Sequence, residues 1–133
     1  MNDNLPSKTV WPCINCEDAH AAIKFLVDAF GFDETAVYND EAGRVSHAEL
    51  RWPEGGGVML GDAGREESEF SHMPTGCASL YVVTDDPEAV YKRATAAGAE
   101  PVRELRDEDY GSRGFSVRDP EGNIWSFGTY RGE

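Results

Sequence analysis

The chain has 133 residues and a formal net charge of -13, and 40% of its residues are hydrophobic. This length suits a single domain with a buried core, and this composition argues against a disordered chain. The excess of acidic residues disfavours nucleic acid as a partner, and it favours either a cationic small molecule as ligand or simply a solvated acidic surface.

No segment has the pattern of a membrane anchor or an export signal. The apolar runs fall well short of the roughly 20 residues that span a bilayer. The first residues, MNDNLPSK, lack the apolar centre of a signal peptide. We therefore expect a cytoplasmic protein that does not contact membranes.

The first predicted element is a strand near residues 9–16, which contains Cys13 and Cys16 in a CxxC spacing. This spacing occurs in zinc and redox sites, but in a strand residues three apart point to opposite faces. Cys77 makes the number of cysteines odd, which argues against a disulfide framework. We therefore favour no joint chemical role for the pair.

A helix and three strands follow the first strand. Asp18 is the expected N-cap of the helix, and Gly31 is its expected C-terminal stop. Between them an apolar stripe recurs at helical spacing, formed by Ile23, Leu26, Val27 and Phe30. The three strands, separated by the turns NDEAG and WPEGG, are predicted near 34–39, 44–51 and 57–61.

The same order of elements returns after a polar linker at residues 62–76. A strand near 78–84 precedes a helix that Asp86 caps, Pro87 starts and Gly98 ends. Three more strands are predicted near 101–106, 112–118 and 123–129. The PEG turn in each half suits a hairpin, because proline fixes φ and glycine supplies a positive φ.

A shift of 67 positions relates the two halves. Residues 18–61 then align with 85–128 without gaps, and 11 of the 44 pairs are identical. Chance would give about three identities at average composition. The identities concentrate in caps and turns, and they include Asp18/Asp85, Gly31/Gly98, Pro53/Pro120, Glu54/Glu121 and Gly55/Gly122.

These patterns predict one α+β domain over 1–133, made of two βαβββ modules near 8–61 and 77–130. One helix covers only one face of a four-stranded unit. We therefore expect the two units to bring their open faces together as a curved mixed sheet around a cleft. This cleft is the expected ligand site.

Two segments carry a family resemblance. EDAHAAIKFLVDAFGF, at 17–32, is similar to the opening helix of the vicinal oxygen chelate superfamily, and DPEGNIWSFGTY, at 119–130, is similar to its terminal signature. Together with the repeat, the resemblance covers nearly the whole chain. The superfamily includes glyoxalase I, fosfomycin- and bleomycin-resistance proteins and extradiol dioxygenases, and the chain most resembles its small glyoxalase/bleomycin-resistance-like proteins. The resemblance implies the paired-module fold and a homodimer.

The resemblance also assigns four metal-ligand positions, on the first and last strand of each module. In this chain they hold Trp11, Met59, Ser79 (or Ala78, by the 67-residue shift) and Ser126. None of these side chains is a good ligand for a divalent metal, which needs His, Glu, Asp or Cys. We therefore expect no metal cofactor and a cleft that binds an organic molecule.

The predicted function is a metal-independent protein that sequesters an antibiotic or another toxic organic compound, as bleomycin-resistance-like members do. The alternatives are a metal-dependent lyase, isomerase or dioxygenase with a displaced site that includes His47 and Glu49, a metal-free enzyme with His47 as its base, and a degenerate structural or sensor module. These two residues share one strand face, and the opposite face carries Ala48 and Leu50, which suit packing under a helix. An ordinary polar pair on a wet sheet face is the other interpretation.

Strand alternation and loop position place further residues on or near the cleft. An aromatic and sulfur-containing lining would suit a flat organic ligand, and the alternative roles are sheet core, a dimer interface or, for the loop residues, a solvated turn. We expect Trp125 and Phe127 in the core on the opposite face, and Trp52 at the surface of a turn. The complete predicted lining is Trp11, Cys13, His47, Glu49, Met59, Ser79, Tyr81, Ser126, Tyr110 and Arg113.

Overall fold

The structure, a computed structural model that describes residues 10–133, confirms the α+β fold of two βαβββ modules. The first module contains β1 (Cys13–Cys16), α1 (Ala19–Phe25), the π-helical turn η1 (Leu26–Phe30), β2 (Asp33–Asn39), β3 (Val45–Arg51) and β4 (Gly57–Asp62). The second contains β5 (Ser79–Val83), α2 (Pro87–Ala96), β6 (Glu100–Asp107), β7 (Arg113–Arg118) and β8 (Ile124–Gly128). A short 3-10 turn, η2 (Phe70–His72), lies in the linker. No helix within residues 10–133 is long and apolar enough to cross a membrane.

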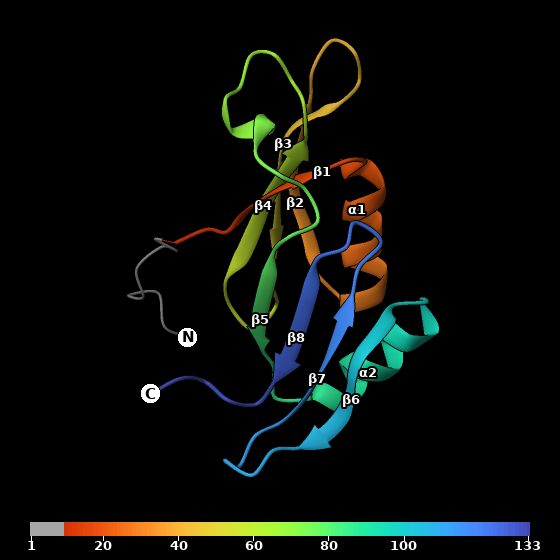
Figure 1. The fold of residues 1–133 in the computed structure, drawn as a ribbon, viewed down its shortest axis with the longest axis vertical. Coiled ribbons are helices and arrows are strands. Elements are labelled where there is room, and N and C mark those ends of the chain that lie inside the picture. Colours follow the sequence, from red (N-terminus) through yellow and green to blue (C-terminus); the bar gives the residue numbers. More distant parts are fainter. Residues whose placement is uncertain (1–9) are drawn as a thin grey trace.

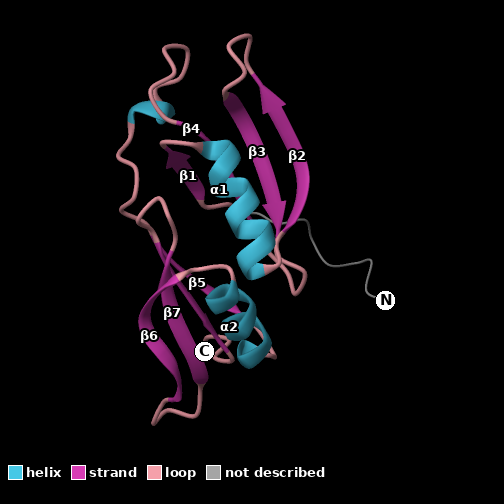
Figure 2. Ribbon diagram, turned by 90° about the vertical axis from the view of Figure 1, so that its right-hand side faces the viewer, coloured by secondary structure: helices cyan, strands magenta, loops and turns pink. Residues whose placement is uncertain are grey.

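The strands form two four-stranded sheets, with the orders β1-β4-β3-β2 and β5-β8-β7-β6. In each sheet the first and last strands of the module run parallel, and the other neighbours run antiparallel. Hydrogen bonds join no described strand of one sheet to the other, so the expected curved sheet consists of two parts. The sheets follow each other along the long axis of the molecule (Figure 1), and both helices lie on the same side of the strands (Figure 2). One face of each sheet is therefore left without a helix.

The first helix accommodates one residue more than the second. Thirteen positions separate its N-cap, Asp18, from Gly31, whose φ of 95° ends the helix. Only twelve separate the N-cap Asp86 from Gly98, whose φ is 88°. The extra residue is absorbed in the π-helical turn η1, because a π turn holds one residue more than an α turn. The two N-caps are therefore 68 residues apart, whereas the hairpins keep the 67-residue shift.

The PEG turn of each module holds the strand–helix loop of the other module. Glu54, in the β3–β4 turn, accepts a hydrogen bond from the backbone N–H of Asp85 at 2.7 Å. Glu121, in the β7–β8 turn, accepts from the backbone N–H groups of Glu17 and Asp18 at 2.7 and 3.0 Å. Because Glu54 and Glu121 are equivalent in the repeat, the internal symmetry of the chain relates the two contacts. Both carboxylates lie near helix N-termini, where negative charge is favoured.

Removing the Glu121 carboxylate should weaken the contact between the modules. Glu121→Ala leaves two N–H groups without their charged acceptor, so we expect the free energy of unfolding to fall by about 1 to 3 kcal/mol. Urea unfolding followed by tryptophan fluorescence measures this loss. Glu104→Ala removes an exposed carboxylate from β6 and should change the free energy by less than about 0.5 kcal/mol. Equal losses in both variants would contradict the capping role.

Arg93 of α2 holds the other end of the first helix. Its Nε and Nη2 donate hydrogen bonds to the backbone carbonyls of Asp28 and Val27 at 2.9 and 3.1 Å. A Cβ atom at Gly31 would lie 2.9 Å from the Nη1 of Arg93, so this glycine permits both the positive φ and the close approach. The guanidinium charge is also favourable at the C-terminal end of the helix dipole.

One aromatic core joins the two modules beneath the helices. The ring of Phe30 packs against Trp125 and Phe127, with centroid separations of 5.5 and 4.8 Å, and both partners are buried as predicted. Trp52 is only 7% exposed, so the prediction of a surface position was wrong. Its ring packs against Phe32 and Phe127, and its Nε1 donates to a β5 carbonyl at 2.8 Å. The turn does hold Trp52, but the second module covers it.

Candidate functional site

A cavity of 520 Å³ lies on the open face of the first sheet. Its floor is formed by one face of three neighbouring strands: Cys13 and Asn15 of β1, Met59 and Gly61 of β4, and His47 of β3. Cys13 and Met59 are direct partners in the parallel register of β1 and β4. The volume of the cavity falls within the range of small-molecule sites.

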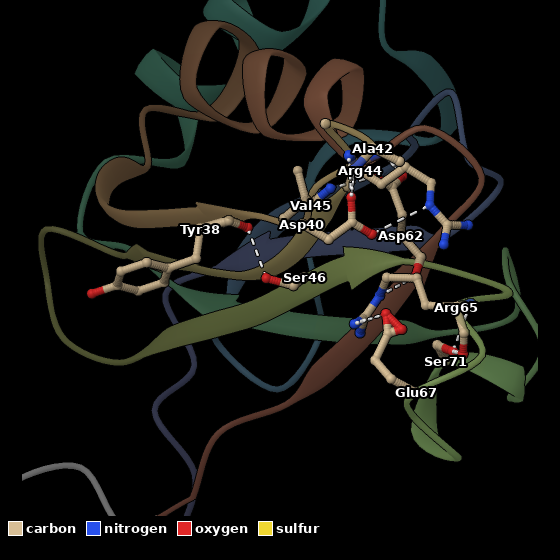
Figure 3. Close-up of polar contacts among 12 residues, drawn as sticks. Tyr38, Asp40, Ala42, Arg44, Val45, Ser46, Asp62, Arg65, Glu67 and Ser71 are labelled. Atoms are coloured by element: carbon tan, nitrogen blue, oxygen red, sulfur yellow. Dashed lines mark hydrogen bonds and ion pairs between the residues drawn. The ribbon is translucent and has the colours of Figure 1, made fainter.

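The linker forms the wall of this cavity. Asn15 donates from its Nδ2 to the backbone carbonyls of Phe70 and Met73, which ties the linker to β1. The hydroxyl of Ser71, which is buried, donates to the carbonyl of Arg65 at 2.7 Å and accepts from the N–H of Arg65 at 2.9 Å. These contacts fold the polar segment into a loop that stands beside the open sheet face (Figure 3).

Sulfur atoms concentrate around the cavity. Residues 10–133 contain five cysteines and methionines, and the four that line the cavity are Cys13, Met59, Met73 and Cys77. Phe70 and Met73, on the linker, are 79% and 61% exposed, so they present apolar surface at the rim. Polarizable sulfur side chains make favourable contacts with aromatic rings. The lining therefore suits a flat, apolar molecule.

His47 and Glu49 form a hydrogen-bonded pair beside the cavity. The Nε2 of His47 lies 2.8 Å from the Oε2 of Glu49, and the imidazole stacks on Tyr38 with a centroid separation of 6.3 Å. Ala48 and Leu50 are fully buried on the opposite face, which confirms the predicted orientation of β3. Only His47 of the pair lines the cavity, so the imidazole is the group that a bound molecule would meet.

The cavity includes three of the predicted lining residues, which are Cys13, His47 and Met59. Glu49 lies next to it through its contact with His47. Trp11 lies outside it, before the start of β1 and next to β4, where a Cβ atom at Gly57 would be 3.0 Å from the indole ring.

The remaining predicted residues belong to the second module and do not reach the cavity. Tyr81 and Ser126 are register partners on the open face of the second sheet, and Ser79 precedes Tyr81 on the same face. Tyr110 is exposed in the β6–β7 turn, and Arg113 pairs there with Asp107 at 3.1 Å and with Glu88 at 3.4 Å. From the second module, the cavity is lined instead by Cys77 and Ala78, just before β5, and by Asn123 in the β7–β8 turn.

The positions that the family resemblance assigns to a metal divide between the two sheets. The N-caps and the registers of β1 and β5 are both offset by 68 residues, so Ser79, and not Ala78, is the equivalent of Trp11. Together with Met59 and Ser126, these side chains do not fit a divalent metal. Within residues 10–133, moreover, no group of three or more His, Cys, Asp or Glu residues is arranged to hold a metal ion.

Cys13 and Cys16 point to opposite faces of β1, as predicted: Cys13 is exposed and Cys16 is buried. Burial, reinforced by the nearby carboxylates of Glu121 and Asp119, raises the pKa of Cys16 to about 12, so its thiol stays protonated and unreactive at neutral pH.

We expect iodoacetamide at pH 8 to alkylate Cys13 and Cys77 in the folded protein and Cys16 only after unfolding. Peptide mass spectrometry reads the sites, and equal alkylation of Cys16 and Cys13 in the folded protein would contradict this assignment.

The linker supplies several cavity residues that sequence reasoning missed. The linker residues are Arg65, Ser68, Phe70, Met73, Pro74 and Gly76, and Asn15 bonds the carbonyls of Phe70 and Met73. Asn15 itself, and Cys77, Ala78 and Asn123 of the second module, also line the cavity without having been predicted to line it. One feature of the sequence could have drawn attention to Arg65: it is the only lysine or arginine in the otherwise acidic segment 62–76. A composition rich in polar residues predicts a linker, but it does not show which face that linker covers.

Comparison with known proteins agrees with this architecture. The family model of the Glyoxalase/Bleomycin resistance protein/Dioxygenase superfamily matches residues 8–127. The chain belongs to this superfamily. An uncharacterised protein of Mycobacterium tuberculosis (strain H37Rv) is 33% identical to this chain over 122 residues. The aligned region covers 88% of this chain and 71% of that protein. An uncharacterised protein of Mycobacterium bovis has the same identity, and the match covers 80% of its length.

Solved structures also share this fold. TioX from Micromonospora sp. ML1 is 30% identical, with a TM-score of 0.80 over 94% of this chain and 100% of TioX. A glyoxalase/bleomycin resistance protein from Streptomyces sp. CB03234 is 23% identical, with a TM-score of 0.68 over 90% of this chain and 98% of that chain. Since one fold can carry unrelated functions, the function of this superfamily member has to be argued from its site.

Proposed function

We propose that this superfamily member binds an organic compound with an apolar body, without a metal, in the cavity on the first sheet, and that it acts by sequestering such a compound. The observation that carries the proposal is the 520 Å³ cavity between an open sheet face and the linker. Small-molecule sites of this size combine an apolar lining with a few converging polar groups. Here Met59, Phe70 and Met73 supply the apolar surface, and His47 and Asn15 are among the polar groups.

The rim of the cavity supports the same proposal. Phe70 and Met73 expose most of their side chains, although the backbone beside them is fixed by Asn15. Neighbouring exposed apolar side chains at the edge of a concave site mark a surface that another molecule covers. A planar ring system in the cavity would cover them, with sulfur contacts from Cys13 and Met59 below.

Titration with N-phenyl-1-naphthylamine, a neutral aromatic amine whose fluorescence rises in apolar sites, tests the proposal. We expect a saturable rise at one molecule per chain and an increase in the thermal midpoint of unfolding, because a ligand that binds only the folded state stabilises it. A panel of neutral, anionic and cationic aromatic compounds, including a bleomycin-type glycopeptide, extends the test. No saturable signal and no thermal shift across the panel would contradict the proposal.

A second candidate is an enzyme in which His47 acts as a base, and the 2.8 Å contact between His47 and Glu49 favours it. A carboxylate in this position orients an imidazole through a hydrogen bond to its ring nitrogen. Metal analysis of protein purified without a chelator addresses the metal-dependent version of this enzyme. Stoichiometric zinc, nickel, manganese or iron that disappears in His47→Ala would favour the enzyme over the binding protein.

A further inference from the structure

We propose that the compound held in this cavity carries an oxyanion, such as a carboxylate or a sulfonate, and that the guanidinium of Arg65 binds it. This inference rests on the proposed function, because it names the chemistry of the ligand for the same cavity. The charged end of the ligand then lies at the linker side of the cavity, and its apolar body lies on the sulfur-lined floor.

Arg65 is fixed in place and faces the cavity. Its backbone exchanges two hydrogen bonds with the buried Ser71, and its Nε donates to the backbone carbonyl of Asp62 at 3.0 Å. Its side chain is only 10% exposed. A Cβ atom at Gly61 would lie 3.6 Å from its Nη2, so the guanidinium lies directly beside the cavity floor.

The donors of Arg65 are only partly used. A guanidinium carries five N–H donors and remains charged in proteins. The closest carboxylate oxygen is that of Glu67, whose side chain is 57% exposed and whose Oε1 lies 3.5 Å from Nη1, which is long for a strong ion pair (Figure 3). Nη2 has no hydrogen-bond or ion-pair partner among residues 10–133. The fork of the guanidinium can therefore bind a planar oxyanion with two parallel hydrogen bonds.

The buried carboxylate nearest in the chain does not compete for Arg65. Asp62 uses Oδ1 to accept from the N–H of Ala19 and Oδ2 to accept from the N–H of Val45, each at 2.7 Å. Asp62 is itself buried, and each of its carboxylate oxygens accepts from a backbone N–H. Among residues 10–133, Glu67, at the surface, is thus the one carboxylate whose removal should free the guanidinium further.

The charge of the cavity differs in sign from the charge of the chain. The sequence has 25 acidic and 12 basic residues, yet the described residues that line the cavity include no Asp or Glu and one Arg. The net charge of -13 favours cations at long range, but exposed charges are screened beyond about 10 Å at 0.1 M salt. At contact distance Arg65 dominates, because a partly buried charge is screened much less.

Two probes that differ by one group test the inference. 8-Anilinonaphthalene-1-sulfonate has the rings of N-phenyl-1-naphthylamine plus a sulfonate, and the dissociation constants of both are measured by fluorescence titration. In Arg65→Gln we expect the affinity for the sulfonate probe to fall by about tenfold or more, because charge-assisted hydrogen bonds are lost. The affinity for the neutral probe should change by less than about threefold, since the apolar floor is untouched.

Glu67→Gln is the second variant, and it does not remove any group that holds the linker. It removes the carboxylate that competes for the guanidinium, so the sulfonate probe should bind several-fold more tightly than to the wild type, with the neutral probe unchanged. Arg65→Lys keeps the charge without the fork and should fall between wild type and Arg65→Gln. Thermal unfolding of each variant confirms that the fold is retained.

The outcomes separate this inference from the proposed function. If the neutral probe binds the wild type but the sulfonate probe responds to neither Arg65→Gln nor Glu67→Gln, the oxyanion role of Arg65 is wrong while the binding cavity stands. Equal weakening of both probes in Arg65→Gln, with no gain in Glu67→Gln, would also overturn it. If neither probe binds the wild type, the proposed function fails together with the inference.

Discussion

Met59→Trp is expected to weaken the binding of N-phenyl-1-naphthylamine by about tenfold or more. Met59 lies in the middle of the cavity floor, where it faces Cys13 on one neighbouring strand and Glu49 on the other. An indole at this position occupies the space that the ligand needs, and a close-packed floor cannot move aside at low cost. The fold should be retained, because Met59 is on the open face and the core lies on the other side of β4.

Met59→Leu is the matched control, since it keeps the side chain apolar and nearly conserves its volume. Its affinity for the probe should stay within about threefold of the wild type, by the same rule for volume-conserving exchanges. Fluorescence titration gives both dissociation constants, and a thermal scan confirms the fold. Unchanged probe affinity in Met59→Trp would show that the probe binds elsewhere.

Trp125→Ala is expected to lower the free energy of unfolding by about 3 to 5 kcal/mol, as for other large aromatic residues removed from a core. Trp125 is fully buried, and it contacts Phe30 and Phe32 of the first module although it belongs to the second. Its Nε1 also donates to the buried carboxylate of Asp119 at 2.8 Å, so the substitution removes a charge-assisted hydrogen bond as well. A loss of this size is a large part of the stability of an ordinary domain.

Urea unfolding by far-ultraviolet circular dichroism measures the effect, and it also tests the shared core. Both modules should unfold in one transition in the wild type and in the variant, because the cluster that includes Trp125 belongs to both. Tyr110→Ala, which removes an exposed aromatic side chain, should change the stability by less than about 1 kcal/mol. Two separate transitions, with only the second sensitive to Trp125→Ala, would contradict a common core.

The fold could be predicted from local signals that the two halves share. Asp18 and Asp86 cap the helices, Gly31 and Gly98 end them, and PEG turns join the last two strands of each module. Each of these signals depends only on residues that are close together in the chain, so it can be recognised in the sequence alone. The shift by 67 positions aligned Asp18 with Asp85, one residue before the true cap, because the added residue in η1 leaves no mark in a gapless comparison.

The contacts between modules could not be predicted in this way. The repeated Glu54 and Glu121 suggested hairpin turns, but their carboxylates bind backbone N–H groups of the opposite module. Trp52 sits at a turn and is buried for the same reason. Long-range partners of this kind depend on how two finished modules pack, and neither periodicity nor turn composition records that packing.

The predicted lining and the cavity share three residues. Strand alternation placed Cys13, His47 and Met59 on an open face, and all three line the cavity. The same rule placed Tyr81 and Ser126 on the equivalent face of the second sheet, but alternation cannot show that these two residues lie outside the cavity. The linker has no repeat partner and no periodicity, so its position over the first sheet, with Arg65 inside, was not accessible from the sequence.

Chemical-shift mapping by nuclear magnetic resonance tests most directly whether the first sheet and the linker form the binding site. The backbone amides are followed while N-phenyl-1-naphthylamine is added to the labelled full chain. The cavity assignment predicts the largest shifts at Cys13, Asn15, His47, Met59 and Met73, and none of that size at Ser79, Tyr81 or Ser126. Shifts centred on the second sheet, with the first sheet and linker unchanged, would contradict it.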